Sequence, residues 1–186
     1  MRRLPVIALL LLLVAGCSEP PQKEIDQAQG AIDTARAAGA DKYATDEYTA
    51  ATSALQKAHE AVDQRDFRQA LSYALDARER AKEAARQSAD GKARARIAAE
   101  GSIASTSAGI QQLEAALKAA DAARVPARDL QDNRTLLTDS RSTLQKARAT
   151  FGAGDYLQVT EMLKGIPEKL DAAVREATDA RGKRRK

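Results

Sequence analysis

The chain has 186 residues and a net charge of +4, from 30 Lys and Arg against 26 Asp and Glu, and aromatic residues make up only 3%. The absence of Trp and the scarcity of other aromatics argue against a large aromatic-lined cavity, so no small-molecule substrate is expected. Alanine is abundant, proline is rare and β-branched runs are missing, which predicts an all-α fold in one domain or two small ones.

The first residues have the three parts of a secretory signal. Arg2 and Arg3 are basic, residues 4–14 form a short apolar run, and small residues precede Cys17. A membrane-spanning helix needs about 20 apolar residues, so this run is too short to be one. An ordinary signal peptide, in which the single cysteine is incidental, is the alternative to a lipoprotein signal.

The end of this segment resembles the lipobox of bacterial lipoproteins, whose cysteine is acylated and becomes the new N-terminus. The matching residues are Val14, Ala15, Gly16 and Cys17. The resemblance implies a signal peptide over residues 1–16, a lipid anchor with palmitate on Cys17, and a lipidated linker over 17–22. Several acyl chains hold a protein on a membrane durably, whereas one chain does so only marginally.

The resemblance also indicates a compartment. Ser18 stands where an aspartate would resemble the inner-membrane retention signal of enteric bacteria, so we expect the periplasm-facing side of the outer membrane, with the inner membrane second. Because acylation consumes Cys17, no thiol remains for a disulfide, and stability must come from packing alone.

The positive charge belongs to the C-terminus. Without Arg2 and Arg3, 28 Lys and Arg stand against 26 acidic residues, and without the five basic residues of 181–186 the ratio becomes 23 to 26. A body with a slight negative charge and few aromatics gives no support to nucleic-acid binding.

Helical periodicity and helix breakers predict five helical stretches. They cover residues 22–38, 45–64 and 66–123, a fourth that has Pro126 in its first turn and stops at Gly152, and a fifth that begins at Asp155. The third is expected as one helix, with a break near Gly91 or Gly101 as the rival. Its apolar seam is expected to include Phe67, Ala70, Leu71 and Ala74. Pro167 predicts a kink near Ile166 in the fifth.

Two sequence segments recur with one displacement, which indicates an internal duplication. Leu55-Gln56-Lys57-Ala58 returns at 144–147, and the capping-box pair Asp66 and Gln69 returns as Asp155 and Gln158, both 89 residues later. Two copies are too few for a stacked repeat array. We therefore expect two three-helix bundles, at 23–95 and 96–180, that share the long helix and are followed by a basic tail at 181–186.

The segment from Leu55 to Arg80 resembles a family of small helical bacterial lipoproteins whose shared domain has no known function. Its Asp66-Phe67 turn, and Gly154-Asp155-Tyr156 in the second copy, are also similar to half of a tetratricopeptide repeat. The period departs from about 34 residues and no proline closes each copy, so a well-capped helical hairpin is favoured over a peptide-binding groove.

No pattern of catalytic or ligand residues stands out. His59 is the only histidine and lies beside the seam of the second helix, where a boundary or surface position is expected. The abundant carboxylates suit solvated helix faces with i,i+4 pairs to Lys and Arg. The sequence therefore predicts no enzyme activity, no cofactor and no metal site.

The C-terminal basic residues Lys183, Arg184, Arg185 and Lys186 have three interpretations. They complement the dipole at a helix C-terminus, they contact an anionic surface such as peptidoglycan or phosphate head groups, or Lys186 is joined covalently to peptidoglycan. The last rests on a resemblance of Arg185-Lys186 to the end of murein lipoprotein.

These observations predict a non-enzymatic envelope spacer, scaffold or adaptor, anchored at Cys17, with peptidoglycan or another envelope protein as its partner. One unbroken helix over 66–123 would span roughly 85 Å and hold the tail far from the lipid. The alternative is a protein-binding accessory or chaperone-type module that uses an Ala-lined groove between helices.

Overall fold

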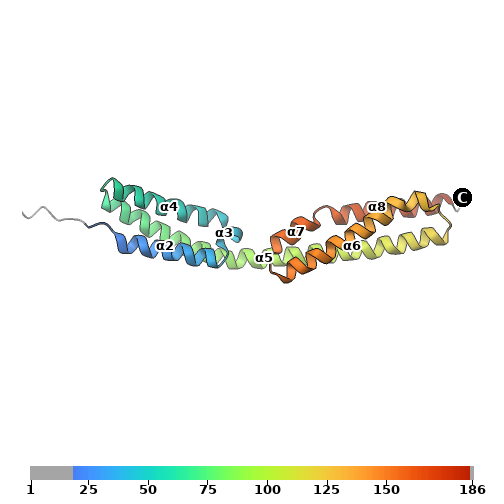
Figure 1. Cartoon of the computed structure of the whole chain (residues 1–186), viewed down its shortest axis with the longest axis horizontal. Coiled ribbons are helices and arrows are strands. Elements are labelled where there is room, and N and C mark those ends of the chain that lie inside the picture. The colour runs from blue at the N-terminus through green and yellow to red at the C-terminus, as the bar shows by residue number, and fades with distance from the viewer. Residues whose placement is uncertain (1–18, 185–186) are drawn as a thin grey trace, which may run out of the picture. The chain divides into compact units, whose positions relative to one another are not determined.

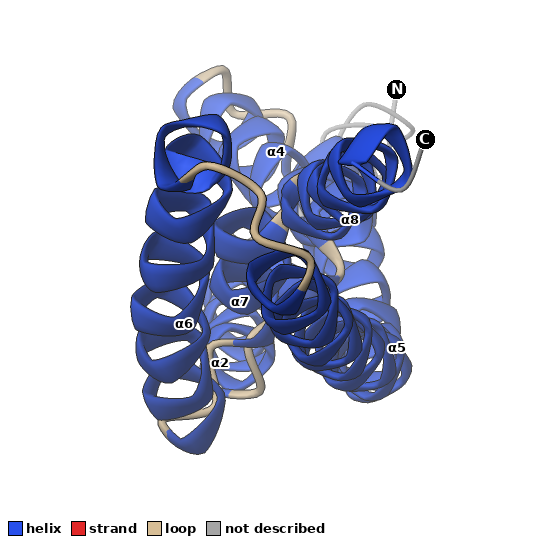
Figure 2. Cartoon of the chain, turned by 90° about the vertical axis from the view of Figure 1, so that its right-hand side faces the viewer, coloured by secondary structure: helices blue, strands red, loops and turns tan. Residues whose placement is uncertain are grey.

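The computed structural model describes residues 19–184, and every element in this range is a helix (Figures 1 and 2). The elements are α2 (Gln22–Ala37), α3 (Ala40–Tyr43), α4 (Thr45–Asp63), α5 (Phe67–Ala122), the 3-10 helix η2 (Ala127–Leu130), α6 (Gln131–Gly152), α7 (Tyr156–Leu163) and α8 (Ile166–Arg184). The all-α prediction is confirmed.

The long third stretch is one helix, α5, which runs from Phe67 to Ala122. Gly91, Gly101 and Gly109 lie inside it without interrupting it. A glycine costs about 1 kcal/mol relative to alanine in a helix, and this cost is too small to break a helix that packs along its length. The rival prediction of a break near Gly91 or Gly101 is wrong.

The chain divides into two compact units, one that ends at Gly91 and one that begins at Lys92. The predicted boundary between residues 95 and 96 lies four positions later. Helix α5 contributes its first part to unit 1 and its second part to unit 2. Each unit has its own cluster of buried apolar residues.

In unit 1, α2, α4 and the first part of α5 pack through small side chains. Helix α2 contributes Ile25, Ala28, Ile32 and Ala35, and α4 contributes Ala51, Ala54, Leu55 and Ala58. The α5 face that packs against them consists of buried alanines: Ala70, Ala74, Ala77, Ala81 and Ala84. Small contact residues allow the axes of packed helices to approach closely.

Unit 2 packs with larger side chains. The second part of α5 contributes Ile110, Leu113, Leu117 and Ala120, and the other helices contribute Leu144, Ala147, Val159, Leu163, Leu170, Ala173 and Ala177. Leu113, Leu163 and Leu170 are almost completely buried. The two units therefore differ in the size of their core residues while both use helical 3,4 spacing.

Most buried positions of the two units correspond. Along α4 and the first part of α5, most buried residues reappear 89 positions later: Ala51 and Ser140, Leu55 and Leu144, Ala58 and Ala147, Ala70 and Val159, Ala74 and Leu163, Ala81 and Leu170, Ala84 and Ala173. Along α2 the displacement is 85, as in Ile25 and Ile110, Ala28 and Leu113, Ile32 and Leu117, Ala35 and Ala120. The connection after the first helix is therefore four residues longer in unit 2 than in unit 1.

The helix ends correspond in the same way. Gly39 (φ 85°) matches Arg124 (φ 58°) at a displacement of 85, and Arg65 (φ 60°) matches Gly154 (φ 84°) at a displacement of 89. A left-handed residue just past a helix end satisfies its last carbonyl groups. Thus each pair has glycine in one unit and arginine in the other, and both members have the left-handed conformation.

Several local predictions need correction. Pro126 does not lie in the first turn of an α-helix, since it precedes the 3-10 turn η2 and α6 begins only at Gln131. The kink predicted near Ile166 is a full break between α7 and α8, where Gly165 has a φ of 74°. Leu71, placed in the α5 seam, is 38% exposed because alanines fill the core face.

The two N-cap predictions are confirmed. The Asp66 carboxylate accepts from the Gln69 N–H at 3.0 Å, and the Asp155 carboxylate accepts from the Gln158 N–H at 3.4 Å. The reciprocal half of the first capping box is absent, because the Gln69 side chain donates to the Tyr73 hydroxyl at 3.0 Å. No pattern in the sequence predicted the short helix α3.

Candidate functional site

The residues that carry the lipoprotein prediction lie outside the described range. This applies to Val14, Ala15, Gly16 and Cys17, and to Arg185 and Lys186 at the other terminus. The first described residue, Glu19, is two positions after Cys17, and helix α2 begins at Gln22. Helix α2 therefore begins only five residues after the candidate acylation site.

The predicted basic tail is partly helical. Helix α8 extends to Arg184, so residues 181–184 continue the helix, and Lys183 is exposed. Lys183 lines a hollow of about 640 Å³ between α8 and the segment before α6, together with Val125, Pro126, Arg128, Asp129, Glu176, Asp179 and Ala180. Acidic and basic side chains are mixed in this hollow, so its charge selects neither cations nor anions.

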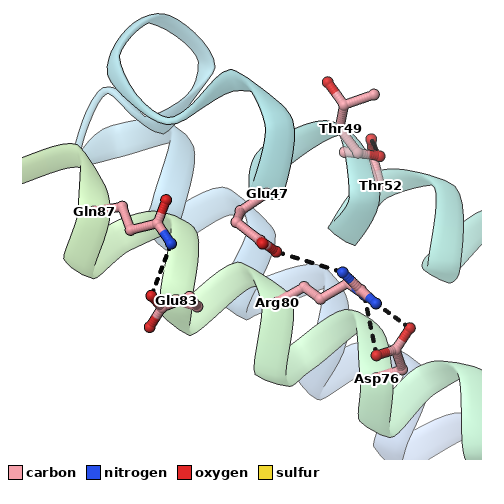
Figure 3. A network of polar contacts seen from close by, with 7 residues as sticks. All are labelled: Glu47, Thr49, Thr52, Asp76, Arg80, Glu83 and Gln87. Carbon is pink, nitrogen blue, oxygen red and sulfur yellow. Dashed lines mark hydrogen bonds and ion pairs between the residues drawn. The ribbon is translucent and has the colours of Figure 1, made fainter. Parts of the chain in front are cut away.

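A polar network joins α4 and α5 on the surface of unit 1 (Figure 3). Arg80 Nε donates to Asp76 at 3.0 Å, and its Nη1 donates to Glu47 at 3.5 Å. Hydrogen bonds from Arg86 and Gln87 lower the pKa of Glu83 from 4.5 to about 2. These side chains are solvent-accessible, so water and salt screen their ion pairs, which add little to stability. The network thus joins α4 to α5 at the surface of unit 1 through the contact between Arg80 and Glu47.

Tyrosines make two further cation contacts in unit 1. Arg36 Nε donates to the Tyr48 hydroxyl at 2.7 Å, and this hydrogen bond raises the pKa of Arg36. Lys57 Nζ lies 5.9 Å from the centre of the Tyr73 ring. Lys57 and Tyr73 also line a small groove between α4 and α5 of about 280 Å³, with Glu60, Ala61, Gln64 and Gln69. Its lining is mostly polar.

A more apolar groove lies between α5 and α6 in unit 2. Its volume is about 410 Å³, and it is lined by Glu100, Ile103, Ala104, Ser107, Arg148 and Phe151. Arg148 reaches across it and donates to the Ser107 hydroxyl at 3.4 Å. Ile97, 68% exposed, precedes these residues on α5. This groove is the best candidate for the predicted binding groove between helices, although Ala104 is its only alanine.

Four large apolar side chains are exposed within residues 19–184: Leu71 and Leu75 on α5 in unit 1, and Ile97 and Leu157 in unit 2. Exposed single apolar residues are common on soluble proteins. Leu71 and Leu75, however, are one helical turn apart and lie on the same side of α5. Sequence reasoning missed this pair because leucine on an amphipathic helix is normally assigned to the core.

His59 is exposed on α4, as expected for a surface position. Within residues 19–184, no three His, Cys, Asp or Glu side chains are close enough together to bind a metal ion. No helix in this same range combines the length and the apolarity needed to cross a membrane.

Comparison with known proteins finds a family model that is similar to part of the chain. Residues 23–100 match the family described as a domain of unknown function (DUF4398). The match covers most of unit 1 and the first nine residues of unit 2. It agrees with the expected resemblance to a family without known function. No curated protein and no solved structure matches the chain.

Proposed function

We propose that this chain is a lipid-anchored, periplasm-facing lipoprotein of the outer membrane that acts without catalysis, as a spacer, scaffold or adaptor in the cell envelope. Its two units would each be a three-helix bundle, produced by duplication. The corresponding buried positions and left-handed turns of the two units support this history.

The observation that carries the proposal is the short distance along the chain between Cys17 and helix α2. Five residues reach at most about 18 Å when fully extended, so an acylated Cys17 would hold unit 1 close to the membrane surface. Long flexible linkers let a domain explore a large volume, whereas this short one restricts its position. A restricted position suits a structural component better than a diffusing one.

The anchor is tested by the Cys17→Ser variant. We expect the natural chain to fractionate with membranes and to yield an N-terminal peptide whose mass includes acyl chains. The variant should be released into the soluble periplasmic fraction. Ser53→Ala, at an exposed position of α4, is the matched control. An unmodified Cys17 in the natural, membrane-bound chain would refute the anchor.

A second part of the proposal concerns peptidoglycan. Lys183 is exposed on the last turns of α8, and basic side chains follow it to the end of the chain. We propose that this basic end contacts peptidoglycan, either electrostatically or through a covalent bond to Lys186. Peptidoglycan purified in hot detergent should retain the natural chain and not the Lys186→Ala variant if the bond is covalent, with Lys164→Ala as the control. Retention lost only in high salt indicates electrostatic contact, and no retention at all contradicts both.

The apolar groove of unit 2 supports the alternative, a protein-binding accessory module. Ile103, Ala104 and Phe151 provide apolar area, and Arg148 provides a polar contact at the rim. Crosslinking in cells should then capture one stoichiometric protein with the natural chain and lose it with Ala104→Asp, which changes an exposed residue of the groove lining. Capture that persists in Ala104→Asp, or that requires Lys186, argues against the groove.

A further inference from the structure

We propose that Leu71 and Leu75 form a membrane-docking surface, which inserts at the head-group boundary of the same bilayer that holds the acyl chains on Cys17. The inference rests on the proposed acylation of Cys17. It adds a second, protein-mediated contact, and it defines which end of unit 1 faces the lipid.

The first argument is the position of the leucine pair relative to the start of α2. Arg78 Nη1 donates to Gln27 at 2.8 Å, and Ser88 Oγ donates to the Ala38 carbonyl at 2.7 Å. The residues of these pairs are 51 and 50 positions apart, so α2 and the first part of α5 run in the same direction in nearly constant register. This register places Gln22 level with residues 72 and 73, between the two leucines.

The second argument is the short chain that connects this level to the anchor. Cys17 precedes Gln22 by five residues, which span at most about 18 Å. The start of α2 and the turn between α4 and α5 lie at the same end of unit 1 (Figure 1). An acylated Cys17 would therefore hold this end, and the leucine pair with it, within reach of the lipid head groups.

The third argument is the chemistry of the α5 surface. Leu71 and Leu75 are 38% and 40% exposed, and the half-buried Phe67 lies one turn before them. Arg68, which is exposed, precedes the pair by three residues, whereas Arg78 is half-buried and donates to Gln27 on α2. An exposed arginine such as Arg68 can lay its aliphatic stem along apolar surface while its charged head stays in water, which is typical of helices that lie in a membrane interface.

Net charge does not drive this contact. Acidic and basic residues are mixed at this end of unit 1: Lys23, Glu24, Asp63, Arg65, Asp66 and Arg68. Attraction to anionic lipids needs an excess of Lys and Arg. The docking is therefore apolar, and it should occur on zwitterionic vesicles and persist in high salt. A contact through the basic C-terminal residues would show the opposite behaviour.

The test uses the full acylated chain reconstituted into phosphatidylcholine vesicles. Because the only natural cysteine is acylated in this proposal, the Leu75→Cys variant has a single free thiol for an environment-sensitive fluorophore. Ala89→Cys is the matched control, since Ala89 is exposed on the same helix about 21 Å farther along. We expect the label at position 75 to shift its emission to shorter wavelength. Nitroxide-bearing lipids should quench it severalfold more strongly than the control.

Mass spectrometry of the N-terminal peptide in the same sample separates the two proposals. An acylated chain whose label at position 75 remains as accessible to water as the control overturns the docking surface and leaves the anchor intact. An unmodified Cys17 overturns the anchor, and with it this inference. A label that is shielded yet not quenched by nitroxide lipids shows that protein covers the leucines, by a second copy if shielding increases with concentration, and also overturns membrane docking.

A second variant checks that the two leucines act together. Leu71→Gln changes an exposed side chain, so it should leave acylation and the unfolding midpoint unchanged. It should nevertheless decrease quenching of the label at position 75, because the apolar surface that inserts is reduced. Undiminished quenching in this variant would contradict a surface made of both leucines.

Discussion

At the scale of single residues, glycines inside α5 have unequal roles. A Cβ atom at Gly91 would lie 2.3 Å from the Tyr43 carbonyl oxygen, which is backbone and cannot rotate away. A Cβ atom at Gly101 would meet no heavy atom within 4 Å. Gly91 is thus required by the close approach of the chain at the end of α3, whereas Gly101 only weakens the helix.

This difference gives a matched pair of substitutions. Gly101→Ala should raise the free energy of unfolding by about 1 kcal/mol, the helix-propensity difference between the two residues. Gly91→Ala should lower it, despite the same gain in propensity, because the Tyr43 backbone must move. Urea unfolding followed by circular dichroism measures both. Equal effects of the same sign would show that the contact at Gly91 is unimportant.

At the scale of elements, the first part of α5 is defined by its alanine face. Ala70, Ala74, Ala77, Ala81 and Ala84 have no exposed surface, and partners on α2 and α4 are also mostly small. Each alanine buries little apolar area, so the face stabilises through close approach of the backbones rather than through large side chains. The packed helices leave no space for a leucine side chain at these positions.

We therefore expect Ala77→Leu to destabilise unit 1 by about 1–3 kcal/mol, the typical cost of overpacking. Ala89→Leu places the same side chain on an exposed position of the same helix and should change stability by less than about 0.5 kcal/mol. Chemical denaturation of the two variants provides the comparison. If Ala77→Leu proved as stable as Ala89→Leu, the helices of unit 1 would be less tightly packed than their buried alanines indicate.

At the scale of the whole molecule, residues 19–184 contain two hydrophobic cores with no residue in common. One contains buried residues between Ile25 and Ala84, and the other contains buried residues between Ala99 and Ala177. Helix α5 passes through both units. The effects of a core substitution should accordingly concentrate in the unit that contains it.

Leu113→Ala tests this separation. Leu113 is completely buried in unit 2, so its truncation should cost about 2–5 kcal/mol. Hydrogen exchange should increase along α6 and α8 while the amides of α2 and α4 keep their protection. Ile32→Ala, in the core of unit 1, should give the reverse pattern. Uniform loss of protection in both variants would indicate a single cooperative unit.

The sequence by itself determined where most of the helices begin and end and that two segments recur 89 residues apart. The N-caps at Asp66 and Asp155 involve residues within one helical turn, so the sequence alone predicted them. The 89-residue repeat consists of identical residues, so it too was visible in the sequence. The 85-residue register of α2 was not, because its identical residues, such as Ile25 and Ile110, are isolated, and Ala28 corresponds to the larger Leu113. Because two such side chains differ in size, their sequence does not show that they occupy corresponding buried positions.

Only the tertiary structure decided that Leu71 and Leu75 are exposed. The helical spacing correctly placed Ala70 and Ala74 in the buried seam but included Leu71 with them, whereas closely packed α2 and α4 leave room there for nothing larger than alanine. The leucines are exposed because of that steric limit, at the end of unit 1 where α2 begins. Hydrophobicity is a property of one residue, whereas the space available to it is set by the neighbouring helices.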